Sequence, residues 1–349
     1  NWAEADSRFD LSKEANEPNK VGYVVEIDPL NPNSTPKKHT ALGRFKHENA
    51  ELVISKDGKI IVYMGDDERG EYLYKYVSNE SINEVKDKST LLSNGNLYVA
   101  KFNDNFTGEW LLLDTQTTGL SSKAEVCIFT RLAASKVGAT TMDRPEWIAS
   151  NSKKNEVCCC LTNNKNRGIK TNKGGDKVDV DKVNPRKNNK YGQIVRWKPR
   201  DNNHSSVYFE WDLFVVAGNP NVHDDNNRGS KNIDKENMFN SPDGLKFDKY
   251  GRLWIQTDGN YSNSGDFKGM GNNQMLIADT NTGKIKRFMV GPKECEVTGL
   301  TFAPDYKTVF VGIQHPGERL GSNFPDNGNN KPRSCIIAIQ KKDGSEILT

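Results

Sequence analysis

The sequence predicts an all-β protein, a six-bladed β-propeller with long loop insertions, and three observations support this. Helical periodicity is poor, with "INEVKDKST" the best helical candidate. Short segments rich in β-branched and aromatic residues are plentiful and are bounded by turn residues. One pattern recurs along the chain: an acidic residue, a strand, a turn and a second strand. We expect residues 1–349 to form a single propeller domain.

The strand candidates follow one another through the whole chain. Turn sequences separate them, such as Lys56-Asp57-Gly58 and Asn281-Thr282-Gly283. The candidates are "GYVVEID", "KIIVYMG", "EYLYKYV", "NLYVAKF", "QIVRWKP", "RLWIQTD", "QMLIADT", "KIKRFMV", "TVFVGIQ" and "CIIAIQ". Three polar stretches, 165–189, 219–237 and 321–333, read as long loops or insertions, and no linker divides the chain.

The recurring phrase sets the expected number of blades. It appears as "HENAELVISKDGKIIVYMGDD", "RPEWIASNSKKNEVCCCLTNN", "SPDGLKFDKYGRLWIQTDGN" and "CEVTGLTFAPDYKTVFVGIQHP". Its leading acids, Glu48, Glu146, Asp243 and Glu296, are separated by 98, 97 and 53 residues. With a blade of about 50 residues, these intervals predict six blades, and the two skipped ones would lie near "NGNLYVAKF" and "YGQIVRWKP".

The leading acids predict a metal site. The innermost strand of each propeller blade lines the central channel, so residues that begin those strands gather at one mouth. Carboxylates brought that close repel one another unless a cation offsets their charge. A hard cation such as calcium prefers oxygen ligands. The predicted metal ligands are therefore Glu48, Glu146, Asp243 and Glu296. Further oxygens lie at the far ends of the same hairpins, at Asp66, Asp67, Asn163, Asn164 and Asp258.

Three more residues are candidates for contact with a substrate. Arg144 lies two residues before Glu146, so on an extended strand both side chains point the same way. Its guanidinium suits a phosphate, and the alternative is a salt bridge that balances the acids. The segment "QHPGER" supplies His315 and Glu318; His315 is either a turn residue or a proton donor and anion contact.

Charge and cysteine usage narrow the function classes. The chain carries 49 basic and 46 acidic residues, a net charge of +3, which gives no global field for nucleic acid or membrane. The basic region 165–200 lacks regularly interleaved aromatics and reads as a solvated loop. The six cysteines form no C-x-x-C pair and read as small buried residues rather than disulfides. No transmembrane span and no signal peptide are recognisable. G-x-S-x-G, H-E-x-x-H and Walker-type motifs are also missing, which leaves metal-assisted chemistry.

Ordered motifs run over nearly the whole chain: "GRFKHE", "VYMGDDER", "TMDRPEW", "LTNN", "SPDGL", "GRLWIQTDG", "GNNQMLIADTNTG" and "EVTGL…IQHPGE". Together these motifs resemble those of the PhoX-type alkaline phosphatases. The resemblance implies a six-bladed propeller whose channel mouth holds calcium and iron and hydrolyses phosphate monoesters. It implies metal ligation by Glu48, Glu146 and Asp243 and a phosphate contact by Arg144. Glu296, His315 and Glu318 extend that set from the repeat.

The resemblance also implies features beyond these residues. Family members carry a metal-binding segment with cysteine and glutamate upstream of the point where this chain begins. We therefore expect the C-terminal part of a longer phosphatase, with a propeller incomplete at its N-terminus, or else a chain that has lost the iron-bridging thiolate. We expect a monomer, exported to the periplasm or the outside, that binds small phosphate esters.

Two other functions remain open from the residues alone. Calcium propellers that resemble gluconolactonases also use carboxylates at the channel mouth, and they open lactones. A non-catalytic propeller would use the same acids to hold one structural ion and would serve as a binding scaffold.

Overall fold

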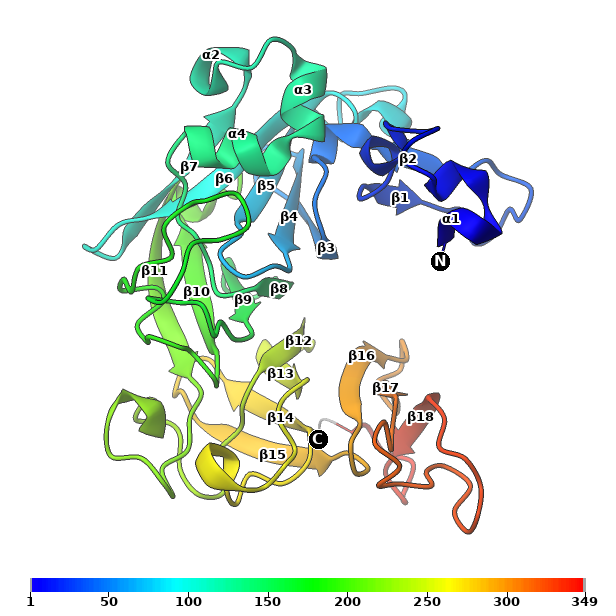
Figure 1. Ribbon diagram of the computed structural model, residues 1–349, viewed down its shortest axis with the longest axis vertical. Coiled ribbons are helices and arrows are strands. Elements are labelled where there is room, and N and C mark those ends of the chain that lie inside the picture. Colours follow the sequence, from blue (N-terminus) through cyan, green and yellow to red (C-terminus); the bar gives the residue numbers. More distant parts are fainter. Residues whose placement is uncertain (1, 348–349) are drawn as a thin grey trace.

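The computed structural model describes residues 2–347, and antiparallel strands dominate it. Figure 1 shows the strands arranged in an arc, with β3, β8, β12 and β16 on its inner side. Strands β3 to β11 form one nine-stranded sheet, β12 to β15 a four-stranded sheet and β16 to β18 a three-stranded sheet. We divide the nine-stranded sheet where β7 pairs with β11, which gives four groups of strands. Neighbouring inner strands contact one another, β3 with β8, β8 with β12 and β12 with β16. The all-β, propeller-like architecture is therefore confirmed.

Each group begins with its inner strand and continues outward. The first contains β3 (His47–Ile54), β4 (Lys59–Asp66), β5 (Leu73–Ser81), β6 (Gly95–Phe102) and β7 (Thr107–Leu113). The second contains β8 (Pro145–Asn151), β9 (Glu156–Leu161), β10 (Gln193–Pro199) and β11 (Tyr208–Val216). The third contains β12 (Pro242–Phe247), β13 (Arg252–Thr257), β14 (Gln274–Asp279) and β15 (Ile285–Val290), and the fourth contains β16 (Glu296–Phe302), β17 (Thr308–Gln314) and β18 (Cys335–Gln340).

The blade count drawn from the spacing was wrong for the described residues. The strand near "NGNLYVAKF" is β6, the fourth strand of the first group, and the strand near "YGQIVRWKP" is β10, the third of the second. Each interval of 98 or 97 residues thus holds one enlarged blade, and residues 2–347 form four such groups. Insertions lengthen these blades: helices in the first, and the loop between β9 and β10 in the second.

The first blade's insertion is helical, which the sequence reading missed. It contains α2 (Thr115–Thr118), α3 (Lys123–Ile128) and α4 (Thr130–Lys136). The Asp114 side chain accepts hydrogen bonds from the backbone at the start of α2, and Ser122 does so for α3. The favoured segment "INEVKDKST" contains only the 3₁₀ helix Lys88–Thr90.

Short elements complete the chain. Before β3 lie α1 (Trp2–Ala5) and the hairpin of β1 (Val24–Glu26) and β2 (Lys37–His39). The 3₁₀ helices besides Lys88–Thr90 are Ser7–Phe9, Glu17–Lys20, Thr40–Leu42, Arg200–Asn202, Asn226–Arg228 and Gly265–Phe267. Within residues 2–347, no helix has the length and apolar character needed to cross a membrane.

Strand β9 shows how the core forms between blades. Its Cys158 and Cys160 pack into the cluster shared with the third blade, whereas Cys159 packs into the cluster shared with the first. This alternation follows from the two-residue period of a strand. All six cysteines are free thiols and five are buried, which confirms that they are not disulfides.

Candidate metal and phosphate site

A bulge places an acid at the start of three inner strands. After its first pair with the neighbouring strand, each of β3, β8 and β12 gains one extra residue, and such a bulge re-aims the side chains within it. Glu48, Glu146 and Asp243 lie inside these three irregularities. The register shifts fall between His47 and Ala50, between Pro145 and Ile148, and between Pro242 and Leu245.

The three bulged acids converge. One carboxylate oxygen from each of Glu48, Glu146 and Asp243 lies within 4.8 Å of the other two. Burial and the charge of Asp243 raise the pKa of Glu48 to about 7, although its side chain is still exposed to solvent. Burial raises the pKa of Asp243 to about 6, and burial together with Asp243 raises that of Glu146 well above its ordinary value. Three close carboxylates therefore resist carrying three negative charges. We call them the acid trio.

Glu296 belongs to a second group beside the trio. Its oxygen, an Asp258 oxygen and a His315 nitrogen lie within 4.8 Å of one another. In β16 the register shift comes later, between Thr298 and Thr301, so Glu296 precedes the bulge. Burial and the charges of Asp243 and Asp258 raise the pKa of Glu296 to about 8, so the two groups interact electrostatically.

His315 belongs to this second group, whereas Glu318 does not. The His315 Nε2 is 3.6 Å from a Glu296 oxygen, and its buried Nδ1 has no hydrogen-bond partner among the described residues. Glu318 is exposed and belongs to neither group; burial raises the pKa of Asp258, and the charge of Glu318 adds to this increase. Glu318 is thus a rim residue.

Arg144 lies against the acid trio. Its Nε and Nη2 donate to the two oxygens of Asp67 at 2.7 and 3.0 Å, and Nη2 is 3.0 Å from a Glu146 oxygen. Nη1 donates to no described residue. The expected reason for this proximity was wrong, because Arg144 precedes β8 and has a left-handed φ of 57° rather than an extended one. The turn and the bulge together bring the two side chains into contact.

The other predicted oxygens divide by position. Asp258 joins the second group and Asp67 holds Arg144. Asp66 is fully buried and pairs with Arg131 at 2.6 Å, which makes it structural. The amide of Asn163 donates to Ser241, and Asn164 forms a backbone bridge with Asn189.

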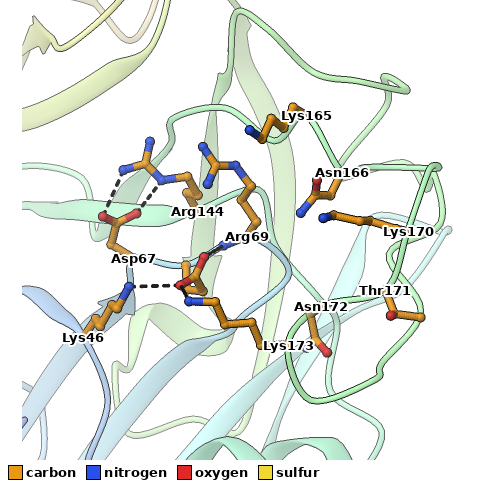
Figure 2. A pocket seen from close by; sticks show the side chains of 11 residues that line it. Lys46, Asp67, Arg69, Arg144, Lys165, Asn166, Lys170, Thr171, Asn172 and Lys173 are labelled. Atoms are coloured by element: carbon orange, nitrogen blue, oxygen red, sulfur yellow. Dashed lines mark hydrogen bonds and ion pairs between the residues drawn. The ribbon is translucent and has the colours of Figure 1, made fainter.

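A cationic cavity of about 670 Å³ begins at Arg144 and Asp67 (Figure 2). The prediction that 165–200 is a solvated loop was wrong, because part of this region lines the cavity. Arg167 of this loop is fully buried and bonds Asp143 and Thr141, and Arg186 is buried on backbone carbonyls. Lys165, Lys170 and Lys173 line the cavity together with Lys46 and Arg69. The basic residues in this region are unevenly spaced and follow no aromatic pattern. Their spacing therefore did not predict that they would line the same cavity.

Comparison with known proteins identifies the family. The alkaline phosphatase PhoX family model matches residues 2–317. The structure of Pseudomonas fluorescens PhoX in complex with vanadate, a transition state analogue, superposes with a TM-score of 0.94 and 55% identity. That match covers 99% of this chain and 62% of the Pseudomonas chain, so the chain spans less than two thirds of that relative.

The remaining comparisons add little. A gluconolactonase from Xanthomonas campestris matches with a TM-score of 0.33 and 11% identity over 83% of this chain and 62% of the other, which is too weak to support an argument. No curated protein matches. The match to the family model and the 55% identity to a family member decide the question, and the chain belongs to the alkaline phosphatase PhoX family.

Proposed function

We propose that the protein is a metal-dependent phosphomonoesterase that releases inorganic phosphate from small organic phosphate esters. The observation that carries this proposal is the acid trio with Arg144 beside it, in a chain that belongs to the PhoX family. The Pseudomonas relative binds vanadate, which has the geometry of a phosphoryl group in transfer.

The acid trio suits calcium. It offers oxygen donors only, and the Glu146 Oε1 is buried without a hydrogen bond, although Arg144 lies 3.0 Å away. The raised pKa values show that burial and repulsion disfavour three free carboxylates. Calcium held by Glu48, Glu146 and Asp243, with Glu296 and Asp258 as further oxygen donors nearby, would supply positive charge against phosphoryl oxygens.

Iron fits the described residues less well. The resemblance implies a cysteine thiolate for iron, but no cysteine sulfur from residues 2–347 lies in either group. Cys158, Cys159, Cys160 and Cys295 pack into hydrophobic clusters, and the buried Cys127 is part of α3. Iron is therefore proposed from the family resemblance alone, and no step below depends on it.

Arg144 is the proposed contact for the phosphoryl group. Asp67 accepts hydrogen bonds from Nε and Nη2 of Arg144, and this pair of bonds fixes the plane of the guanidinium. Nη1 is left to donate to a phosphoryl oxygen. A fixed cation beside the scissile group stabilises the charge that develops in phosphoryl transfer, without reorganisation during the reaction. In this proposal Arg144 both forms salt bridges with the acids and contacts the phosphate, because the salt bridges orient its guanidinium toward the anion.

His315 and Glu318 have supporting roles in this proposal. His315 is proposed to contact a substrate oxygen or to donate a proton to the leaving group, next to Glu296. Glu318 is proposed to act at the rim, through its charge on Asp258. Replacing Glu318 by Gln should therefore change turnover far less than replacing Arg144 or Glu146.

The biological setting follows the family in this proposal. Residues 1–349 act as one propeller domain of a phosphatase that is exported to the periplasm or outside. The protein acts as a monomer on small-molecule esters and needs neither nucleic acid nor membrane.

A substrate comparison tests the proposal against its alternatives. The full-length protein is assayed with an aryl monophosphate and with gluconolactone, first with excess calcium and then with a chelator. We expect calcium-dependent phosphate release and no lactone opening. Lactone opening alone would support the lactonase, and calcium-dependent thermal stability without turnover of either substrate would support the scaffold.

A further inference from the structure

The cavity beside Arg144 is lined by more basic than acidic side chains. Six cationic side chains line it against two acidic ones, although the whole chain is nearly neutral. The cations are Lys46, Arg69, Arg144, Lys165, Lys170 and Lys173, and the acids are Asp67 and Glu68. A wall with this excess of positive charge around a cavity of about 670 Å³ attracts anions.

Ion pairs with the two acids involve only three of the six cationic side chains. Glu68 accepts from Lys46 at 2.9 Å and from Lys173 at 2.6 Å, and Asp67 binds Arg144. Arg69, Lys165 and Lys170 form no ion pair with any residue in the described part of the chain. The buried Nε of Arg69 also lacks a hydrogen-bond partner among these residues. The unpaired cations lie farther along the wall than Arg144, toward the loop that carries Lys165 and Lys170 (Figure 2).

Buried contacts hold this loop in place. The Asn172 side chain is buried and donates to the Gly70 carbonyl at 3.0 Å, in the turn between β4 and β5. Gly70 has a φ of 80°, and a Cβ there would lie 2.8 Å from the Asn172 Cβ. Arg167 anchors the other end through Asp143 at 2.7 Å. The two free lysines are therefore presented by an anchored loop rather than by a solvated one.

We propose that this cavity is a subsite for a second anionic group on the substrate. The inference rests on the proposed function, in which Arg144 contacts the phosphoryl group that is cleaved. The remainder of the ester would extend past Arg144 into the cavity, where Arg69, Lys165 and Lys170 would meet a phosphate or carboxylate. The preferred substrates are then phosphate monoesters whose alcohol part is itself anionic.

Matched esters test this by kinetics. The full-length, metal-loaded protein is assayed with butyl phosphate, 4-phosphonooxybutanoate and butane-1,4-diol bisphosphate, which share a primary alkoxide leaving group. We expect a higher kcat/KM for the two charged esters than for butyl phosphate. In the double variant K165Q/K170Q this preference should fall about 5-fold, because an exposed charge pair contributes up to about 1 kcal/mol.

A control and the contrary results make the test decisive. Lys177 is exposed in the same loop but does not line the cavity, so K177Q should keep the preference. Equal kcat/KM for the three esters in the wild type would overturn the subsite, and so would a preference that K165Q/K170Q retains. If only the bisphosphate is preferred, the subsite takes phosphate rather than carboxylate.

A binding measurement keeps the subsite testable without turnover. Calorimetry compares butane-1,4-diphosphonate with butylphosphonate, which cannot be hydrolysed. Tighter binding of the diphosphonate that K165Q/K170Q reduces would support the subsite. Equal affinities would refute it. Failure of all three esters to release phosphate would count against the proposed function alone, since the calorimetry would still decide the subsite.

Discussion

At the scale of single residues, the site depends on carboxylates kept closer together than their charges favour. The sequence was enough to group Glu48, Glu146 and Asp243, because the same repeat position must point toward the same axis. It was not enough to separate Glu296, because the position of a bulge within a strand leaves no clear trace in the letters. Nor did it reveal that Asp67 holds Arg144, since the two residues come from different blades.

Replacing Glu146 by Gln tests the acid trio. The amide keeps the size of the side chain but removes one anionic ligand from the least accessible position of the trio, where the side chain is 2% exposed. Phosphate release should fall at least about 100-fold, as loss of a metal-site group does, while the circular dichroism spectrum stays unchanged. Retained activity in a folded variant would remove Glu146 from its assigned role.

Replacing Asp67 by Asn tests how Arg144 is positioned. The amide cannot accept both guanidinium hydrogen bonds, so the fork loses its fixed plane. We expect kcat to fall by about 10- to 100-fold. Asp67→Glu should recover part of that loss, because it restores the charge and both acceptors. If Asp67→Asn has wild-type kcat, Arg144 does not depend on this contact.

At the scale of elements, the first and second blades pack too closely to tolerate a side chain at Gly65. Gly65 of β4 faces the start of β8, where an added Cβ would lie 2.4 Å from the Pro145 carbonyl oxygen and 2.6 Å from that of Glu146. The glycine is therefore required by the close approach of two blades, and the position of Glu146 depends on it.

The variant Gly65→Ala should push β8 away from β4. We expect a loss of about 1–3 kcal/mol in the free energy of unfolding, typical of overpacking, together with weaker calcium binding. Urea unfolding and calcium titration measure the two effects. Gly174→Ala is the matched control, because the nearest atoms to its added Cβ are 3.4 Å away. Wild-type stability and calcium affinity in Gly65→Ala would show that β4 and β8 do not fix the site.

A buried histidine joins the first two blades. The Tyr63 hydroxyl of β4 lies 3.1 Å from the Nδ1 of His204, which precedes β11. Burial and the nearby Lys75 lower the pKa of His204 from 6.5 to about 4. The fold therefore favours neutral His204, and this preference costs no stability above pH 6.5. As the pH falls from 6.5 toward 4, the unfolded chain takes up a proton that the native chain does not, and stability is lost.

This linkage predicts a pH-dependent effect of His204→Gln. The shift corresponds to about 3 kcal/mol of stability lost by the wild type between pH 6.5 and 4. The variant should lose less over that range, although it starts less stable at pH 7. Urea unfolding at pH 7 and pH 4.5 measures the difference. Equal losses for both proteins would mean that His204 is not held neutral.

The sequence located elements better than it counted blades. A strand forms within each of the ten expected segments, because β-branched residues between turn sequences are a local signal. The counting failed because a 98-residue interval fits two ordinary blades as well as one blade with insertions. Helices α2 to α4 are three short helices interrupted at Gly119 and Phe129, so none is long enough for the periodicity to stand out.

At the scale of the whole molecule, acidic and basic side chains gather in two separate regions that adjoin at Arg144 and Asp67. Although the net charge of the chain is only +3, the acid trio and the neighbouring group of Glu296 and Asp258 form an acidic region, and a cationic cavity lies next to it. Arg144 and Asp67 belong to both regions. A phosphate ester, the substrate proposed above, needs cations around it, so the carboxylates would suit it only when metal ions offset their charge.

The most direct test of this account is phosphate release from an aryl monophosphate by the full-length protein, measured as calcium is titrated into the wild type and the Glu146→Gln variant. The account predicts that release by the wild type rises with calcium to a plateau and disappears with chelator. The variant should stay inactive at every calcium concentration. Release that is independent of calcium, or equal in the two proteins, would contradict a metal site built on the acid trio.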